Sequence, residues 1–355
     1  MSEKAFNTAL SMPSQQGAEA LAYTPKDEDF AFDTSININI DQNYASVGFW
    51  KGVFTRFFKS VRAVIGLVII VVCIIFALIG PHMNQYGYSD IQSVYDEETG
   101  KEITARSLPP RIPWLHRLMT GEDYEDEFAD CTFLFGTDSL GRDLWTRVWY
   151  GARVSLLIAF VTIFIDMIVG MSFGLISGYF GGVADNLMQR FVEVANSIPR
   201  LVIVGVLATF MPKGIGLVIV ALLLTEWIGM SKIARAEMLK NKEQEYIMAS
   251  RTLGAGSGRI IFIDILPNTI GPIITQMMFS IPTAIFTEAF LSFVGVGIML
   301  PQCSIGSLIE DGFNNITTLP YQIVPPIVVL ALLMLAFNFV GDGLREALAP
   351  RIEDM

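Results

Sequence analysis

The chain has 355 residues, of which 52% are hydrophobic and only 17% are charged. Soluble domains are usually about 45–50% apolar and about 25% charged, so this composition points to a protein that resides in lipid. The formal net charge of −11 argues against nucleic acid as a partner, because phosphate groups are bound by basic patches.

Residues 1–60 are predicted to form a cytoplasmic tail. Met1–Asn43 is polar and acidic and contains no hydrophobic stretch, so we expect no secretory signal there. Residues 1–48 have the composition of a disordered or partly ordered segment. Between Phe49 and Lys59, aromatic residues are interleaved with basic ones. This pattern is typical of an amphipathic helix at the level of the lipid headgroups, where it would anchor the chain.

Six apolar segments are predicted to cross the membrane. The first is the clearest, because about 20 apolar residues at a rise of 1.5 Å cross a hydrocarbon layer of about 30 Å. The third is the weakest, since Pro199 and Arg200 interrupt it and it must use part of Phe191–Ile198 to be long enough. The six segments are Val61–Gly80, Val154–Gly178, Leu201–Met211 with part of the preceding stretch, Gly214–Met230, Thr269–Ile298 and Gln322–Val340.

Basic residues beside the predicted spans indicate the orientation, because Lys and Arg are enriched on the cytoplasmic side of a membrane. Ser231–Asn268 has six basic and four acidic residues, whereas Leu300–Tyr321 has no Lys or Arg. We therefore expect a multi-pass protein of the bacterial plasma membrane whose N-terminus and C-terminal residues 346–355 are cytoplasmic. Pro81–Tyr150, with 6 basic and 13 acidic residues, is expected outside, either as a solvated surface or as a contact surface for a delivering partner. The basic residues that flank the first span and end the chain are Lys51, Arg56, Lys59, Arg62, Arg345 and Arg351.

Glycines recur at every fourth position of the second span, at Gly170, Gly174 and Gly178. This spacing places them on one helix face and lets a neighbouring backbone approach closely. We expect the face to pack within the subunit, and a seam with a second subunit remains the alternative.

Three acidic residues, Asp166, Glu226 and Glu288, lie in or near predicted spans. A carboxylate at membrane depth is costly, so each should face the protein interior or a water-filled path. Glu226 is also compatible with a place near the cytoplasmic surface. Asp166 and Glu288 are compatible with a polar partner, with protonation, or with a place on the transport path, which keeps a proton-coupled secondary transporter open as a rival.

The polar segment Ser231–Asn268 is predicted to form a helix, a turn at Gly254 and a second helix, with Pro267 at the start of the next span. Such a short helical segment between two spans has no core of its own. We expect it to be a docking surface for another protein.

This segment resembles the "EAA loop" of the membrane subunits of bacterial ABC importers, with Arg259, Pro267 and Asn268 among the matching residues. Met248 stands where that family usually has Glu, and Ser250 replaces its second Ala. The resemblance implies that the loop inserts a coupling helix into a cleft of a separate ATPase subunit. The residues expected to make this contact are Glu245, Met248, Ala249, Ser250, Arg251, Leu253 and Gly254.

Four further stretches are similar to the C-type subunits of peptide importers, and the match covers about residues 45–355. Ile305 departs from the usual Trp of that family, and Glu193 from its usual Asp. The implied fold is all-helical and polytopic, a type I (MetI-like) permease with six spans and a five-helix core over residues 151–345. The four stretches are Gly136–Asp143 with Gly151–Leu156, Gly178–Gly182 with Asp185 and Arg190, Glu288–Phe293 with Pro301, Ser304 and Gly306, and Phe337–Arg345 with Pro350 and Arg351.

The resemblance implies a pore-forming subunit that imports peptides, with oligopeptides first and dipeptides, nickel chelates or glutathione as alternatives. Its implied partners are a second homologous membrane subunit of B type, two ATPase subunits and an extracytoplasmic binding protein. The single Gly-Lys pair, Gly100-Lys101, is followed by Glu102 and is no P-loop, so we expect no enzyme activity in this chain. A membrane scaffold or signalling partner of an ATPase is a further alternative.

We expect neither a metal nor another cofactor, because Cys73, Cys131 and Cys303 show no ligand spacing. Cys131 and Cys303 both fall in segments expected outside the membrane. A disulfide between them therefore remains open.

Overall fold

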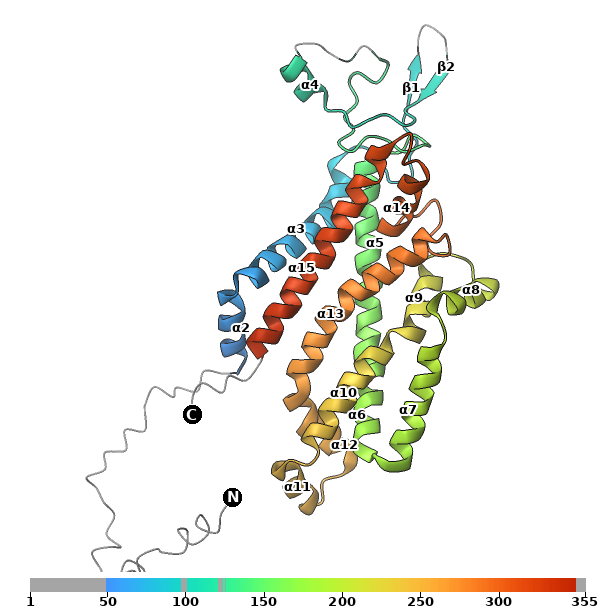
Figure 1. Ribbon diagram of the computed structural model, residues 1–355. Coiled ribbons are helices and arrows are strands. Elements are labelled where there is room, and N and C mark those ends of the chain that lie inside the picture. Colours follow the sequence, from blue (N-terminus) through green and yellow to red (C-terminus); the bar gives the residue numbers. More distant parts are fainter. Residues whose placement is uncertain (1–48, 97–100, 121–123, 125, 349–355) are drawn as a thin grey trace, which may run out of the picture. The chain divides into compact units, whose positions relative to one another are not determined.

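The computed structural model describes residues 49–96, 101–120, 124 and 126–348, so the predictions for residues 1–48 and 349–355 lie outside the described part. Nearly all regular structure in that part is helical (Figure 1). The predicted all-helical fold is confirmed. The predicted amphipathic segment before the first span is a helix, α2 (Phe49–Lys59).

The remaining elements follow in chain order. The helices are α3 (Val61–Met83), α4 (Pro113–Thr120), α5 (Leu144–Ile165), α6 (Met171–Phe180), α7 (Gly182–Ser197), α8 (Arg200–Phe210), α9 (Ile215–Thr225), α10 (Trp227–Asn241), α11 (Glu245–Thr252), α12 (Ser257–Arg259), α13 (Leu266–Phe293), α14 (Ile305–Asn314) and α15 (Val324–Leu348). Two π-helical turns, η2 (Asp166–Gly170) and η3 (Ile260–Ile265), join α5 to α6 and α12 to α13. A 3₁₀ turn, η4 (Pro320–Gln322), precedes α15. The strands β1 (Ser93–Asp96) and β2 (Lys101–Thr104) pair antiparallel, with Ser93 opposite Thr104.

Five helical stretches are long and apolar enough to cross a membrane, and a sixth is counted if α7 and α8 form one broken span. α7 and α8 meet at an angle of 79°, and α8 turns away from the direction of α7 in Figure 1. The cause is local, because a residue before proline avoids the helical region, and Ile198 before Pro199 is extended (φ −82°, ψ 121°). This is the segment that the sequence indicates as the weakest span. The five stretches are Val61–Met83, Leu144–Phe180, Ile215–Asn241, Ser257–Phe293 and Pro320–Leu348.

Three expected boundaries differ from the structure. α5 begins at Leu144, before the expected end of the outer loop at Tyr150, because the Asp143 side chain accepts a hydrogen bond from the Thr146 N–H and caps the helix. α10 continues to Asn241, and the next candidate span begins at Ser257, so only the part of residues 231–268 that contains α11 lies between two candidate spans.

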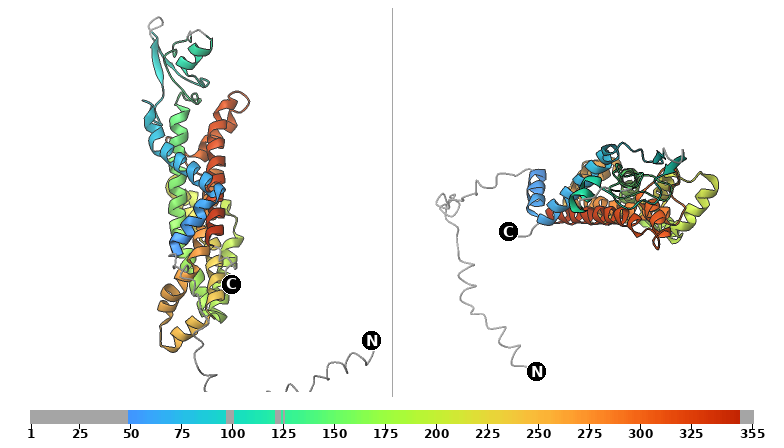
Figure 2. Two further views of the ribbon diagram at one scale, coloured as in Figure 1. Left: turned by 90° about the vertical axis from the view of Figure 1, so that its left-hand side faces the viewer. Right: turned by 90° about the horizontal axis from the view of Figure 1, so that it is seen from above.

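The helices of residues 49–348 pack closely where small residues meet. α3 and α15 lie side by side in Figures 1 and 2, and Gly66 of α3 sits against the main chain of Ala336. α13 packs on both α5 and α15. A single apolar cluster joins α2, α3, α5, α13, α14 and α15, with Leu333 and Ile285 fully buried in it. α6 to α10 are arranged around separate, smaller clusters.

The stretch before α5 is held by its own polar groups. The Asp138 carboxylate accepts from the Arg142 N–H and from the Arg142 guanidinium at 2.7 Å. The carbonyl of Thr137 accepts from the Tyr321 hydroxyl and from the Gln322 amide, both at 3.0 Å. This stretch therefore fixes the start of α5 against the segment before α15.

Candidate functional site

The helix α11 lies between two candidate spans and ends in a complete C-terminal capping motif. The Gly254 N–H donates to the Arg251 carbonyl at 2.9 Å, and the Ala255 N–H donates to the Ser250 carbonyl at 3.1 Å. These are the two hydrogen bonds of a Schellman cap, which requires a left-handed residue after the helix. Gly254 supplies it with φ +85°. The glycine therefore determines where the chain leaves α11.

One face of α11 is fixed to the helices on either side. Ile247 is fully buried in an apolar cluster with α6, α10 and η3. The Ser250 hydroxyl donates to the Asp264 carboxylate of η3 at 2.7 Å. The Asn268 amide donates to the Tyr246 hydroxyl at 3.3 Å. Because of these contacts, α11 is expected to move with α10 and α13 rather than alone.

The opposite face of α11 is open. Six of the seven residues predicted to contact an ATPase are exposed, and Ser250 is half-buried. Leu253 is 88% exposed and Met248 is 53% exposed, although both side chains are apolar. The Arg251 guanidinium lies 5.2 Å from the centre of the Tyr179 ring, within reach of a cation–π contact. Two large exposed apolar side chains beside charged ones are typical of a contact surface.

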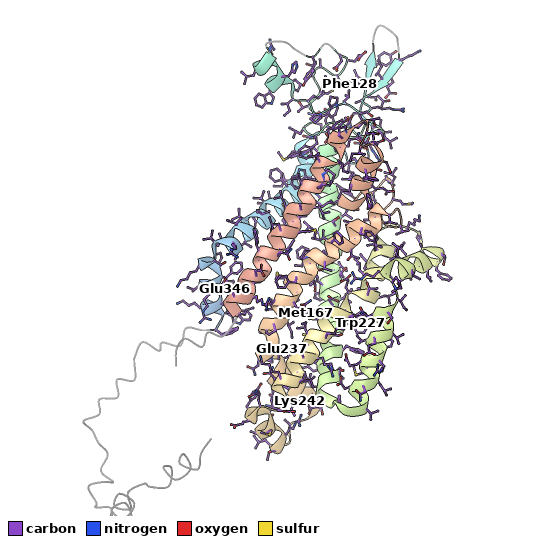
Figure 3. The ribbon with its side chains drawn as sticks, in the orientation of Figure 1. Phe128, Met167, Trp227, Glu237, Lys242 and Glu346 are labelled. Atoms are coloured by element: carbon purple, nitrogen blue, oxygen red, sulfur yellow. The ribbon has the colours of Figure 1, made fainter. Side chains whose placement is uncertain are left out.

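The glycine face of the second span packs against α10. A Cβ at Gly170 would lie 2.5 Å from the Trp227 carbonyl oxygen, and one at Gly178 would lie 2.9 Å from the Met238 Cβ. Gly174 lies even closer to the main chain of α10. The structure thus places all three glycines in a seam within the chain. Figure 3 labels Trp227 at the start of α10 and Lys242 just beyond its end.

A partly buried ion pair joins α7 to α10. The Asp185 carboxylate accepts two hydrogen bonds from the Arg235 guanidinium of α10, at 2.7 and 2.6 Å, and another from the Ser177 hydroxyl of α6. The Lys242 ammonium donates to the Gly178 carbonyl at 3.1 Å. Polar contacts therefore join α6, α7 and α10 next to α11.

Glu288 is completely buried where α5, α13 and α14 meet. Its carboxylate accepts from the Ser155 hydroxyl at 2.6 Å and from the Ser292 hydroxyl at 2.9 Å. The Ser155 oxygen in turn accepts from the Ile305 N–H at 3.3 Å. Of the alternatives open for this residue, the structure favours a polar partner, because hydrogen-bonded groups surround it on three sides.

Asp166 and Glu226 belong to one charged cluster in the interior. Glu226 is 8% exposed at the break between α9 and α10, and its carboxylate lies 2.6 Å from the Arg200 guanidinium. The same guanidinium nitrogen donates to the Thr287 hydroxyl at 3.0 Å. Asp166 is buried at the first position of η2 and interacts electrostatically with both Glu226 and Arg200. Glu226 is therefore buried within the protein and paired with a cation.

Two basic residues have partners that the sequence did not predict. Arg200 interrupts the third predicted span and pairs with Glu226, and Arg235, one of the basic residues of 231–268, pairs with Asp185. For Arg200 the sequence holds a signal, because a charge beside an apolar stretch needs a partner at membrane depth.

Within the described residues, no group of three or more His, Cys, Asp and Glu side chains could hold a metal ion. All three cysteines are free, so Cys131 and Cys303 are not joined. Burial raises the pKa of the Cys303 thiol to about 11.

Two family models match the chain. Residues 170–354 match the model described as "Binding-protein-dependent transport system inner membrane component". Residues 48–110 match the N-terminal transmembrane domain of oligopeptide transport permease C. Together the two models cover the first span and the helices from η2 onward.

Curated relatives are similar over most of the chain. The oligopeptide transport system permease protein OppC of Bacillus subtilis is 37% identical over 86% of this chain and 91% of its own length. The dipeptide transport system permease protein DppC of the same organism is 36% identical over 92% of this chain and 93% of its own length. Among solved structures, a chain of the MetNI methionine ABC transporter matches with a TM-score of 0.48 and 20% identity, over 58% of this chain and 96% of that one.

Proposed function

The chain belongs to the family of binding-protein-dependent transport system inner membrane components, and we propose that it forms one of two membrane subunits of an ATP-driven peptide importer. The identities of 36–37% over most of the chain to oligopeptide and dipeptide permeases carry this proposal. Oligopeptides are the first candidate substrates, and dipeptides are the second. The chain is a transport component, and a separate subunit hydrolyses the ATP.

The proposed contact with the ATPase is the exposed face of α11. This face combines large apolar side chains, Met248 and Leu253, with the charged Glu245 and Arg251. A protein surface of this composition excludes water well when a partner covers it. The proposal places α11, the N-terminus and the C-terminus in the cytoplasm, and the basic residues of 231–268 support that side.

The proposed mechanism uses α11 as a lever. When two ATPase subunits close on ATP, they displace the α11 that each membrane subunit presents. Ile247 and the Ser250–Asp264 hydrogen bond transfer this displacement to α10 and α13. Access to the path between the two membrane subunits then alternates between the two faces, and ATP shifts the equilibrium because it favours one closed state of the ATPases. A binding protein outside delivers the peptide.

A matched pair of substitutions tests the contact. Leu253→Asp places a charge at the tip of the proposed lever, and Leu118→Asp makes the same change at a 77% exposed leucine of α4, far from α11 in Figure 1. We expect Leu253→Asp to lose co-purification of the ATPase subunits and ATP-driven peptide uptake in reconstituted vesicles. Leu118→Asp should retain the ATPase subunits, and both variants should insert into the membrane.

Three results would overturn parts of the proposal. Retention of the ATPase and of uptake by Leu253→Asp would exclude α11 as the contact. Labelling of Leu253→Cys only from the exterior would reverse the orientation. Peptide uptake driven by a proton gradient without ATP would favour the secondary transporter.

A further inference from the structure

A polar cavity lies within the span region, beside the charged cluster of Arg200 and Glu226. It has a volume of about 210 Å³ and lies between the start of α8, the α9–α10 break and the middle of α13. Its walls include Lys232 of α10 and Gln276, Ser280 and Thr283 of α13. The helices around it belong to candidate spans, on which polar groups are expected to face the protein or water, because polar groups that face lipid are costly.

Four polar side chains of α13 form a stripe along the helix. Gln276, Ser280, Thr283 and Thr287 follow one another at spacings of four, three and four residues, so they share one helix face. The Thr283 hydroxyl donates to the Phe279 carbonyl of its own helix at 3.1 Å. Its oxygen therefore remains available as an acceptor for an N–H group in the cavity.

Of the charged side chains in the cavity wall, two are paired with each other and Lys232 is not paired within the described residues. The one carboxylate among the lining residues, Glu226, is paired with Arg200 at 2.6 Å. Lys232 is exposed, and within the described residues no ion-pair or hydrogen-bond partner of its ammonium group is found. A lone ammonium group on a candidate span requires water or an anion beside it. The cavity therefore offers a free cation, hydroxyl acceptors and an amide.

We propose that this cavity binds the C-terminal end of the peptide in transit, with the terminal carboxylate on Lys232 and the last peptide groups on Gln276 and Thr283. The inference rests on the proposed function, whose substrate it locates. A complete small-molecule site usually has about 300–1,000 Å³, so this cavity is sized for one end of a chain. Every unmodified peptide carries the same carboxylate, and its recognition leaves the side chains of the peptide unrestricted.

Thiol labelling of the assembled complex in vesicles tests the site. Thr283→Cys places a thiol in the cavity wall, and Phe286→Cys, at a 53% exposed position of the same helix outside the lining, is the matched control. Both are made with Cys131→Ser, because Cys73 and Cys303 are buried. The reagents are an anionic and a cationic methanethiosulfonate. Each labelling rate is divided by the rate at which the same reagent reacts with a small free thiol.

We expect Thr283→Cys to react about threefold faster with the anionic reagent, because the exposed and solvent-screened Lys232 ammonium lines the same cavity, and Phe286→Cys to resist both reagents. Adding Lys232→Gln should remove the preference. With binding protein and ATP, a free-acid peptide should slow the labelling, and the same peptide with a C-terminal amide should not.

Equal rates with both reagents, no reaction at Thr283→Cys, or equal protection by the amidated peptide would overturn the inference. ATP-driven uptake by the parent complex is measured in the same vesicles. Uptake together with any of these results overturns only the peptide site. Absence of uptake overturns the proposed function, and the inference with it.

Discussion

At Gly254, the effect of the backbone conformation on the proposed coupling loop can be separated from the effect of side-chain contacts. A Cβ at this position would meet no atom within 4 Å in the chain, so a side chain causes no clash there. Its φ of +85° costs a residue other than glycine about 1–2 kcal/mol. That amount changes the ratio of capped to uncapped loop by about 5- to 30-fold.

We therefore expect peptide uptake to fall in the order parent, Gly254→Asn, Gly254→Ala and Gly254→Val, from highest to lowest. Asparagine adopts the left-handed region more readily than alanine, and a β-branched residue adopts it least. Peptide uptake in reconstituted vesicles at saturating ATP measures the order, with the amount of inserted protein as the control. If the side chain instead collided with a docked ATPase, alanine would be tolerated best, because it is the smallest. Uptake by Gly254→Ala above that of Gly254→Asn would refute the backbone argument.

Three further predictions concern buried groups. Burial raises the pKa of the Asp143 carboxyl, so protonation of this group is favoured in the folded state. The parent should therefore lose stability relative to Asp143→Asn as the pH rises above the ordinary carboxyl pKa of about 3.9. A stability difference between the two proteins that does not change with pH would contradict this. The Cys303 thiol has a raised pKa of about 11 and should resist maleimide at pH 8 in the folded chain. The partly exposed Cys131 should react under the same conditions. Equal labelling of the two cysteines before denaturation would contradict the burial of Cys303. Ser155→Ala removes a hydrogen-bond donor from the buried Glu288 carboxylate and should lower the free energy of unfolding by about 1–3 kcal/mol, seen as a lower midpoint of thermal unfolding. The control Ser197→Ala, at an exposed serine, should change the midpoint little. Equal midpoints of the two variants would count against the hydrogen bond.

The candidate spans and the helix α11 could be predicted from local sequence. Hydropathy over about 20 residues is a local property, and it identified α3 and α15 without knowledge of their neighbours. Gly254 was predicted as a turn because the left-handed conformation at a helix end favours glycine, and its φ of +85° agrees. The bend at Pro199 was indicated in the same way, as the weak point of the third span.

The interior polar contacts could not be predicted because they join distant parts of the chain. Ser155 and Glu288 are 133 residues apart, and their hydrogen bond depends on the packing of α5 against α13. The end of the fourth span was also misplaced, since hydropathy ends it at Met230 and assigns Ser231–Asn241 to a separate polar helix, whereas α10 runs through both without a break. Helical hydrogen bonds do not require an apolar sequence.

Three helix breaks lie where the proposed displacement of α11 would have to be absorbed. α6 meets α5 at η2, α10 meets α9 at Glu226, and α7 meets α8 at the 79° bend. One member of the charged cluster lies at each break, since Asp166 begins η2 and Arg200 begins α8. Packed helices move as units, and breaks absorb the change in direction. α6, α7 and α10 are joined by the Asp185–Arg235 pair, so a push on α11 is expected to rotate them together about this cluster. The cavity beside Arg200 and Glu226 has walls from α8 and from α10, which lie on different sides of these breaks, so the expected rotation would change its shape.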